Sequence, residues 1–85
     1  MASKRTKDHV AIRRWVEARR GKPAKVDTGG EGGILRIDFD PPDATLVRID
    51  WDEFFRIFDR EGLDFLHDES KDSRFNKFVS ASSAS

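Results

Sequence analysis

Apolar side chains recur at helical spacing in the first quarter of the chain, at positions i, i+3 and i+4. They are Ile12, Trp15 and Val16. One apolar stripe of this kind predicts a helix that packs on a core and runs to about Arg20. Thr6 or Asp8 can cap its first turn, and Gly21 stands where a glycine ends a helix in left-handed backbone. The first six residues precede the helix, and we expect them to form a flexible basic arm.

A second helical pattern begins at Asp50. Four aromatic residues follow at i, i+3, i+4 and i+7: Trp51, Phe54, Phe55 and Phe58. Asp50 and Glu53 have the spacing of a capping box, in which each side chain bonds the other residue's backbone N–H. Gly62 ends the pattern. We therefore expect a helix from Asp50 to Gly62 whose aromatic face lies in the core.

Alternation with period two predicts strands between and after the helices. The clearest is 34–39, where Leu35, Ile37 and Phe39 share one face. Further short strands are expected at 24–27, 45–49 and 63–67. The glycine-rich segment 28–33 predicts a loop, because glycine disfavours regular structure. Residues 75–79 suit a single docked turn.

These elements predict an α+β fold in one small domain. The order is α-β-β-(β)-α-β, and we expect an antiparallel sheet with two helices packed on one face. The domain covers residues 7–79, and the Ser/Ala tail 80–85 is expected to be disordered. A chain of 85 residues with no cysteine has neither a second core nor disulfides. With no secretory signal pattern and no membrane-length apolar run, we expect a cytoplasmic protein.

Charge is sorted along the chain although the net charge is zero. Residues 1–26 hold nine Lys/Arg against two acids, a net of +7, whereas 27–70 hold four Arg against thirteen acids, a net of −9. The last fifteen residues add +2. Such polarity bears on partners rather than on fold.

Six basic residues form the candidate binding face: Arg13, Arg14, Arg19, Arg20, Lys22 and Lys25. We expect a non-catalytic interaction or regulatory module that binds an acidic protein, or associates with itself through faces of opposite charge. The alternative is nucleic-acid binding. The basic helix can lie on phosphates, and the segment from Arg20 to Lys25 is similar to the Arg-Gly-Arg-Pro core of an AT-hook, with Lys22 replacing the second arginine.

A carboxylate enzyme is the third possibility, because paired carboxylates serve acid–base catalysis or bind hard cations. The candidates are Asp38, Asp40, Asp50 and Asp52, with the two histidines His9 and His67. No nucleophile, phosphate loop or metal-ligand spacing accompanies them. We therefore predict no catalytic residue, no metal, no cofactor and no small-molecule ligand.

Several segments taken together resemble a family of small uncharacterised bacterial proteins over residues 8–79. They include Asp8-His9, Gly21-Lys22-Pro23-Ala24, residues 33–39, Trp51-Asp52-Glu53-Phe54-Phe55 and residues 73–77. Some members of that family are labelled 1,4-alpha-glucan branching enzyme. A branching enzyme resembles a large barrel enzyme, and 85 residues cannot build such a barrel, so the resemblance implies no catalytic residues here. An association with glucan metabolism belongs with the carboxylate enzyme as the third possibility.

Overall fold

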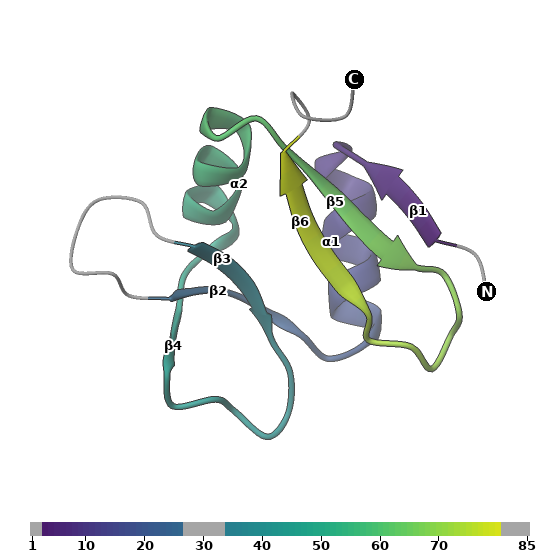
Figure 1. The fold of residues 1–85 in the computed structure, drawn as a ribbon. Coiled ribbons are helices and arrows are strands. Elements are labelled where there is room, and N and C mark those ends of the chain that lie inside the picture. Colours follow the sequence, from purple (N-terminus) through teal and green to yellow (C-terminus); the bar gives the residue numbers. More distant parts are fainter. Residues whose placement is uncertain (1–2, 27–33, 81–85) are drawn as a thin grey trace.

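The computed structural model describes residues 3–26 and 34–80, and within them it has two helices and six strands (Figure 1). In chain order they are β1 (Ser3–Thr6), α1 (His9–Ala18), β2 (Lys22–Val26), β3 (Ile34–Asp38), β4 (Leu46–Arg48), α2 (Trp51–Arg60), β5 (Leu63–Asp68) and β6 (Asn76–Ser80). The glycine-rich segment and the end of the tail, 81–85, lie outside the described residues.

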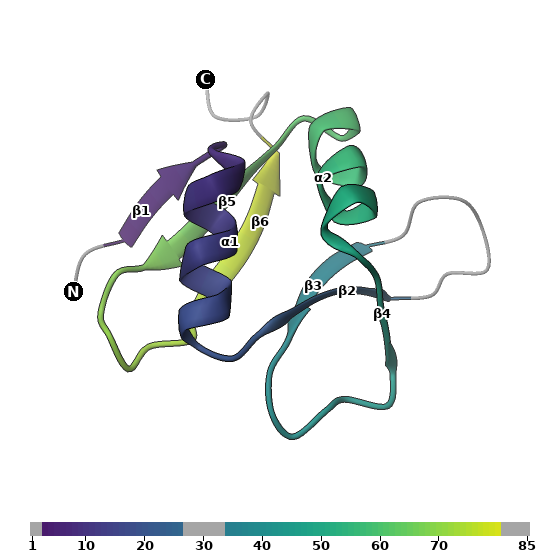
Figure 2. The same ribbon diagram turned by 180° about the vertical axis from the view of Figure 1, so that it is seen from behind.

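The strands form two separate antiparallel sheets of three strands each. One has the order β1-β5-β6 and the other β3-β2-β4. This confirms the α+β class, but the single sheet we expected is wrong. β3 is an edge strand of one sheet and β6 is an edge strand of the other, and the two are not paired with each other. Helix α1 lies against the sheet β1-β5-β6 with its outer side uncovered (Figure 2).

Ser3–Thr6 is not a flexible arm. It forms β1 and pairs with β5, so that Ser3 lies opposite Asp68 and Thr6 opposite Phe65. Arg5 Nε donates to Asp64 at 2.7 Å, and Lys7 Nζ lies 2.7 Å from the same carboxylate. The sequence Ser-Lys-Arg-Thr has no apolar alternation, so the pattern gave no sign of a strand. Its pairing depends on β5, which lies some sixty residues away in the sequence.

The C-terminal segment also differs from expectation. Residues 75–79 do not form one docked turn, because Asn76–Ser80 is a strand paired with β5. Ser80, which we placed in the disordered tail, is the last residue of this strand and lies opposite Leu63. Backbone hydrogen bonds to β5 explain the extended conformation of a segment in which Phe78 and Val79 are adjacent and no period-two alternation predicts a strand.

Both helices begin at the capping residues that the sequence predicts. The Asp8 carboxylate accepts from the backbone N–H of Val10 at 3.0 Å, and Asp50 accepts from Glu53 N–H at 2.8 Å. Acidic side chains at such positions satisfy amides that have no partner within the helix. The return half of the expected capping box is absent from the described contacts, because the Glu53 carboxylate instead binds Lys25 at 2.9 Å.

The end of α1 shows a one-residue correction. Arg20, not Gly21, has left-handed backbone, with φ of 60°. Gly21 N–H donates to Val16 C=O and Arg20 N–H to Glu17 C=O, the two bonds of a Schellman motif. A Cβ on Gly21 would stand 2.7 Å from Ile37 Cγ2 and 2.9 Å from Val16 Cγ1. Glycine is therefore required at 21 for close packing, not for its φ.

The core lies between the helices and the two sheets. Its buried members are Ile12, Trp15, Val16, Leu35, Ile37, Phe54, Ile57, Phe58 and Phe65. All nine belong to the elements that the apolar spacing predicted. The Trp15 indole N–H donates to Asp68 C=O at 2.8 Å, which satisfies its one buried polar atom and ties α1 to the end of β5.

Candidate functional site: a basic pocket at the end of helix α1

Two of the six predicted basic residues are neutralised by carboxylates. Arg13 Nε lies 3.1 Å from Glu17, one turn along the same helix. Lys25 Nζ lies 2.9 Å from Glu53, and this lysine side chain is only 21% exposed. Glu53 of the acidic middle segment therefore masks Lys25, and Glu17 of the same helix masks Arg13, so both cations are poor candidates for an external anion.

Arg19 has a different role, because its guanidinium binds only neutral groups. Its Nε donates to Ser73 C=O at 2.6 Å and its Nη2 to Ser70 C=O at 2.8 Å. Nη1 donates to Trp15 C=O at 3.0 Å, and the guanidinium carbon lies 4.2 Å from the Trp15 ring centroid. Arg19 thus fastens the loop 69–75 to α1. No carboxylate pairs with it among the described residues, so its positive charge is not cancelled.

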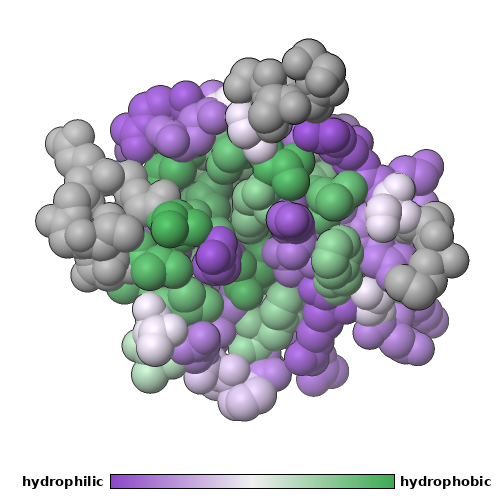
Figure 3. Space-filling model, in the orientation of Figure 1, coloured by the Kyte–Doolittle hydropathy of each residue, from purple (hydrophilic) through white to green (hydrophobic). Residues whose placement is uncertain are grey.

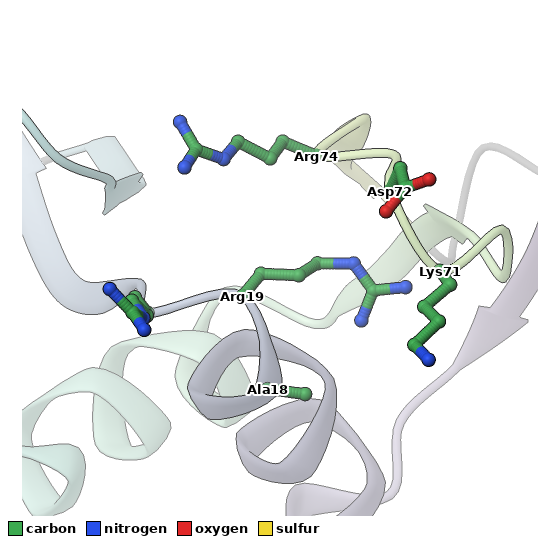
Figure 4. Close-up of a pocket in the computed structure, with 6 residues that line it drawn as sticks. Ala18, Arg19, Lys71, Asp72 and Arg74 are labelled. Atoms are coloured by element: carbon green, nitrogen blue, oxygen red, sulfur yellow. The ribbon is translucent and has the colours of Figure 1, made fainter.

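The loop 69–75 brings two further cations to the end of α1. Arg74 Nη1 donates to Asp40 C=O at 3.3 Å and its guanidinium lies 5.2 Å from the Phe39 ring centroid. Lys71 is exposed and has no hydrogen bond or ion pair in the part of the chain that the structure describes. Figure 4 shows Arg19 reaching toward the loop that carries Lys71 and Asp72.

These side chains surround an open pocket of about 230 Å³, which we call the basic pocket. Its lining residues are Ala18, Arg19, Arg20, Lys71, Asp72 and Arg74. The lining thus contains four cations and one carboxylate. None of the four cations forms an ion pair within residues 3–26 and 34–80, and Arg20 is exposed. Guanidinium and ammonium groups gathered in this way favour a carboxylate or a phosphate oxygen.

Arg14 and Lys22 lie close to this pocket in the sequence without lining it. Both are exposed and have no ion pair in the described portion of the chain. Arg14 precedes Ala18 by one helical turn, which places it on the same face of α1 as the pocket. Of the six candidates, the structure therefore brings Arg19 and Arg20 into the pocket, leaves Arg14 and Lys22 beside it, and pairs Arg13 and Lys25 elsewhere.

The carboxylates do not converge on one site. Asp38 is buried, accepts from Asp43 N–H at 3.0 Å and from Arg48 Nε at 3.1 Å, and thereby closes the turn after β3. Asp50 caps α2, whereas Asp40 and Asp52 are exposed. Across residues 3–26 and 34–80, no three His, Asp or Glu side chains are placed to hold a metal ion.

The two histidines lie in different environments. His9 stacks on Phe55 with ring centroids 4.0 Å apart, and its Nε2 lies 2.9 Å from Asp59. His67 is buried beside Trp15 and Phe65, with centroids 5.6 Å and 5.4 Å away. Among the described residues, neither histidine shares a cavity with both a carboxylate and a nucleophile, which an acid–base centre of the predicted kind requires.

Two buried or half-buried carboxylates have lowered pKa values. Hydrogen bonding from Lys7, followed by the hydrogen bond and charge of Arg5, holds the pKa of Asp64 below its ordinary value. The backbone N–H of Ser70 does the same for the pKa of Asp68, which begins the loop 69–75. Both carboxylates stabilise the sheet and loop that carry the pocket, and neither lines it.

Sequence reasoning missed Lys71 and Arg74. Their only signal was the net charge of +2 in the last fifteen residues, which is small and lies far along the chain from Arg19 and Arg20. The Trp15–Asp68 and Arg19–Ser73 hydrogen bonds bring the two segments together.

No protein-family model, curated protein or solved structure matches this chain. The family resemblance noted from the motifs therefore stays a prediction. Within the described residues, neither helix is long and apolar enough to cross a membrane.

Proposed function

We propose that this protein is a non-catalytic binding module that docks an acidic segment of a partner protein in the basic pocket. The observation that carries the proposal is a pocket lined by four cations and a single carboxylate, in which the guanidinium groups of Arg19 and Arg74 are bonded to neutral carbonyls. Since those carbonyls do not cancel the charge, an incoming carboxylate gains an electrostatic interaction that the protein itself does not supply.

The order of the pocket supports binding rather than a loose charged surface. Arg19 is held by three hydrogen bonds, and Arg74 is held between Asp40 C=O and the Phe39 ring. Positioned guanidinium groups lose little conformational entropy when a ligand arrives. The side chains of Arg20 and Lys71, in contrast, have no hydrogen bond or ion pair within the described residues, so they can adjust to the partner.

An acidic protein segment suits this geometry better than a DNA duplex. Duplex DNA presents one charge per about 1.7 Å of axis, so strong binding needs a row of phosphate contacts. The row of cations predicted from the sequence is interrupted, because Arg13 and Lys25 are ion-paired and the Arg19 side chain is bonded to the loop 69–75. One small pocket is suited to one or two carboxylates.

The test is an NMR amide titration with a short peptide of alternating Glu and Ser residues, at about 50 and 200 mM salt. We expect shifts at residues 18–20 and 71–74 that shrink at the higher salt. Lys71→Gln should weaken binding by about twofold to fivefold, the worth of one exposed ion pair. Arg56→Gln is the matched control, because Arg56 is an exposed cation on α2 outside the pocket, and it should leave the affinity unchanged.

Three results decide against the proposal. They are the absence of shifts at low salt, equal losses in Lys71→Gln and Arg56→Gln, and shifts with an AT-rich duplex where the peptide gives none. The last result would favour the nucleic-acid alternative through Arg14, Arg20 and Lys22, and the first would direct attention to other surfaces.

A further inference from the structure

The break between the two sheets leaves a groove whose two sides are edge strands. β3 is the edge of one sheet and β6 the edge of the other (Figure 1). Two hollows lie between them, of about 360 Å³ and 200 Å³. Arg36 and Phe78 line both, so the two hollows form one continuous groove, which we call the sheet-edge groove.

The backbone of β6 turns unpaired groups toward this groove. Asp68 N–H donates to Phe75 C=O, so Phe75 and the alternate residues after it point their backbone groups at β5. Asn76 and Phe78 therefore direct N–H and C=O away from β5.

The same alternation applies to β3. Pro23 C=O accepts from Ile49 N–H, so Pro23 and Lys25 point their backbone groups at β4. Their partners across the ladder in β3 are Ile37 and Leu35, whose N–H and C=O consequently point away from β2. The Leu35 C=O accepts from Arg36 Nη1 at 3.0 Å, a side-chain contact that an added strand would replace. Exposed edges of this kind are templates for an added strand, and here two edges border one groove.

Side chains give the groove an apolar centre with charge at its ends. The inner hollow has Leu35, Ile57 and Leu63 in its wall, and its one acidic lining residue among those described is Glu61. Ile34 also lines this hollow and is 52% exposed, and Figure 3 shows hydrophobic residues gathered in the middle of this face. Arg36 and Lys77 line the outer hollow, which has no acidic residue among its lining residues within the described chain.

We infer that the sheet-edge groove binds an extended segment of a partner protein by strand addition, with apolar side chains in the inner hollow and an acidic side chain at Arg36 and Lys77. The unpaired edges require extended backbone, and the alternate pockets select alternate side chains. Charge complementarity makes the occupant acidic at one end. The groove is separate from the basic pocket and does not depend on the function proposed for it.

The probe is a capped peptide of alternating Val and Glu, titrated by NMR against the full chain. We expect amide shifts at Leu35, Ile37, Asn76 and Phe78, and slower hydrogen exchange at the edge amides. The same peptide with Lys in place of Glu should bind about tenfold more weakly, because exposed ion pairs are exchanged for like-charge contacts. N-methylation of alternate peptide amides should abolish binding, since it removes the backbone donors of an added strand.

The variants Lys77→Glu and Lys71→Glu separate this site from the basic pocket. Both reverse one exposed lysine, but only Lys77 lines the groove. Lys77→Glu should weaken the Val/Glu peptide and leave the Glu/Ser peptide of the pocket unchanged, and Lys71→Glu should do the reverse. Unaltered binding of the N-methylated peptide, or equal losses in the two variants, would overturn the inference. Concentration-dependent dimers that the peptide disrupts would instead assign the groove to a second copy of the chain.

Discussion

Replacing Gly21 by alanine tests how closely α1 packs on the sheet β3-β2-β4. The added Cβ would lie 2.7 Å from Ile37 Cγ2, 2.9 Å from Val16 Cγ1 and 3.0 Å from Phe39 Cε1. The contacts to Ile37 and Val16 are shorter than carbon atoms tolerate, and both belong to buried core residues. The Ile37 and Val16 side chains must therefore shift within the core to admit the methyl group.

The magnitude follows from two opposing effects. Overpacking of a core position costs about 1–3 kcal/mol. Replacing glycine by alanine also lowers the conformational entropy of the unfolded chain, which stabilises the folded state by about 0.4–1 kcal/mol. We expect a net loss of about 1–2 kcal/mol in the free energy of unfolding, which for a domain of this size lowers Tm by about 5–15 °C. Thermal unfolding followed by circular dichroism measures it.

Gly62 is the matched control, because it has positive φ, +62°, and no atom within 4 Å of the Cβ that alanine would add. Asparagine adopts left-handed backbone more readily than alanine does. Gly62→Asn should therefore be more stable than Gly62→Ala, whereas Gly21→Asn should be less stable than Gly21→Ala because asparagine is larger. The reasoning is refuted if Gly21→Ala leaves Tm unchanged, or if asparagine is the better residue at position 21.

Three further predictions concern the residues that support the pocket. Arg20→Gly should raise the free energy of unfolding by about 0.5–1 kcal/mol, because Arg20 has φ of 60° and glycine has no Cβ to strain there. Chemical denaturation measures this change. A lower free energy of unfolding would contradict the Schellman assignment. Arg19→Lys should lower the free energy of unfolding by about 1–3 kcal/mol and speed amide exchange in residues 69–75. The reason is that lysine cannot reach Ser70 and Ser73 C=O together. Unchanged exchange would contradict this prediction. Since the pKa of Asp64 is lowered in the folded state, its contribution is present above the ordinary carboxyl value of 3.8 and is lost as pH falls through the folded value. Asp64→Asn should therefore destabilise the protein at neutral pH and flatten the decline of Tm in acid, and parallel acid curves would contradict this.

The sequence by itself determined the helices, most of the core and the helix starts. These features depend on neighbours in the chain: the i, i+3, i+4 spacing of Ile12, Trp15 and Val16, and the aspartates that cap the first turns. A helix satisfies its backbone locally, so its pattern appears in one short window. The α+β class followed from the same windows.

Only the tertiary structure decided how the strands pair and where the cations meet. β1 and β6 have no apolar alternation in their sequences and are strands because β5 lies between them. The basic pocket joins Arg19 and Arg20 to Lys71 and Arg74, which lie about fifty residues further along the chain, through hydrogen bonds from Trp15 and Arg19 to distant carbonyls. Partners in a sheet and charges in a pocket are chosen by proximity in space, and a one-dimensional pattern does not contain that distance.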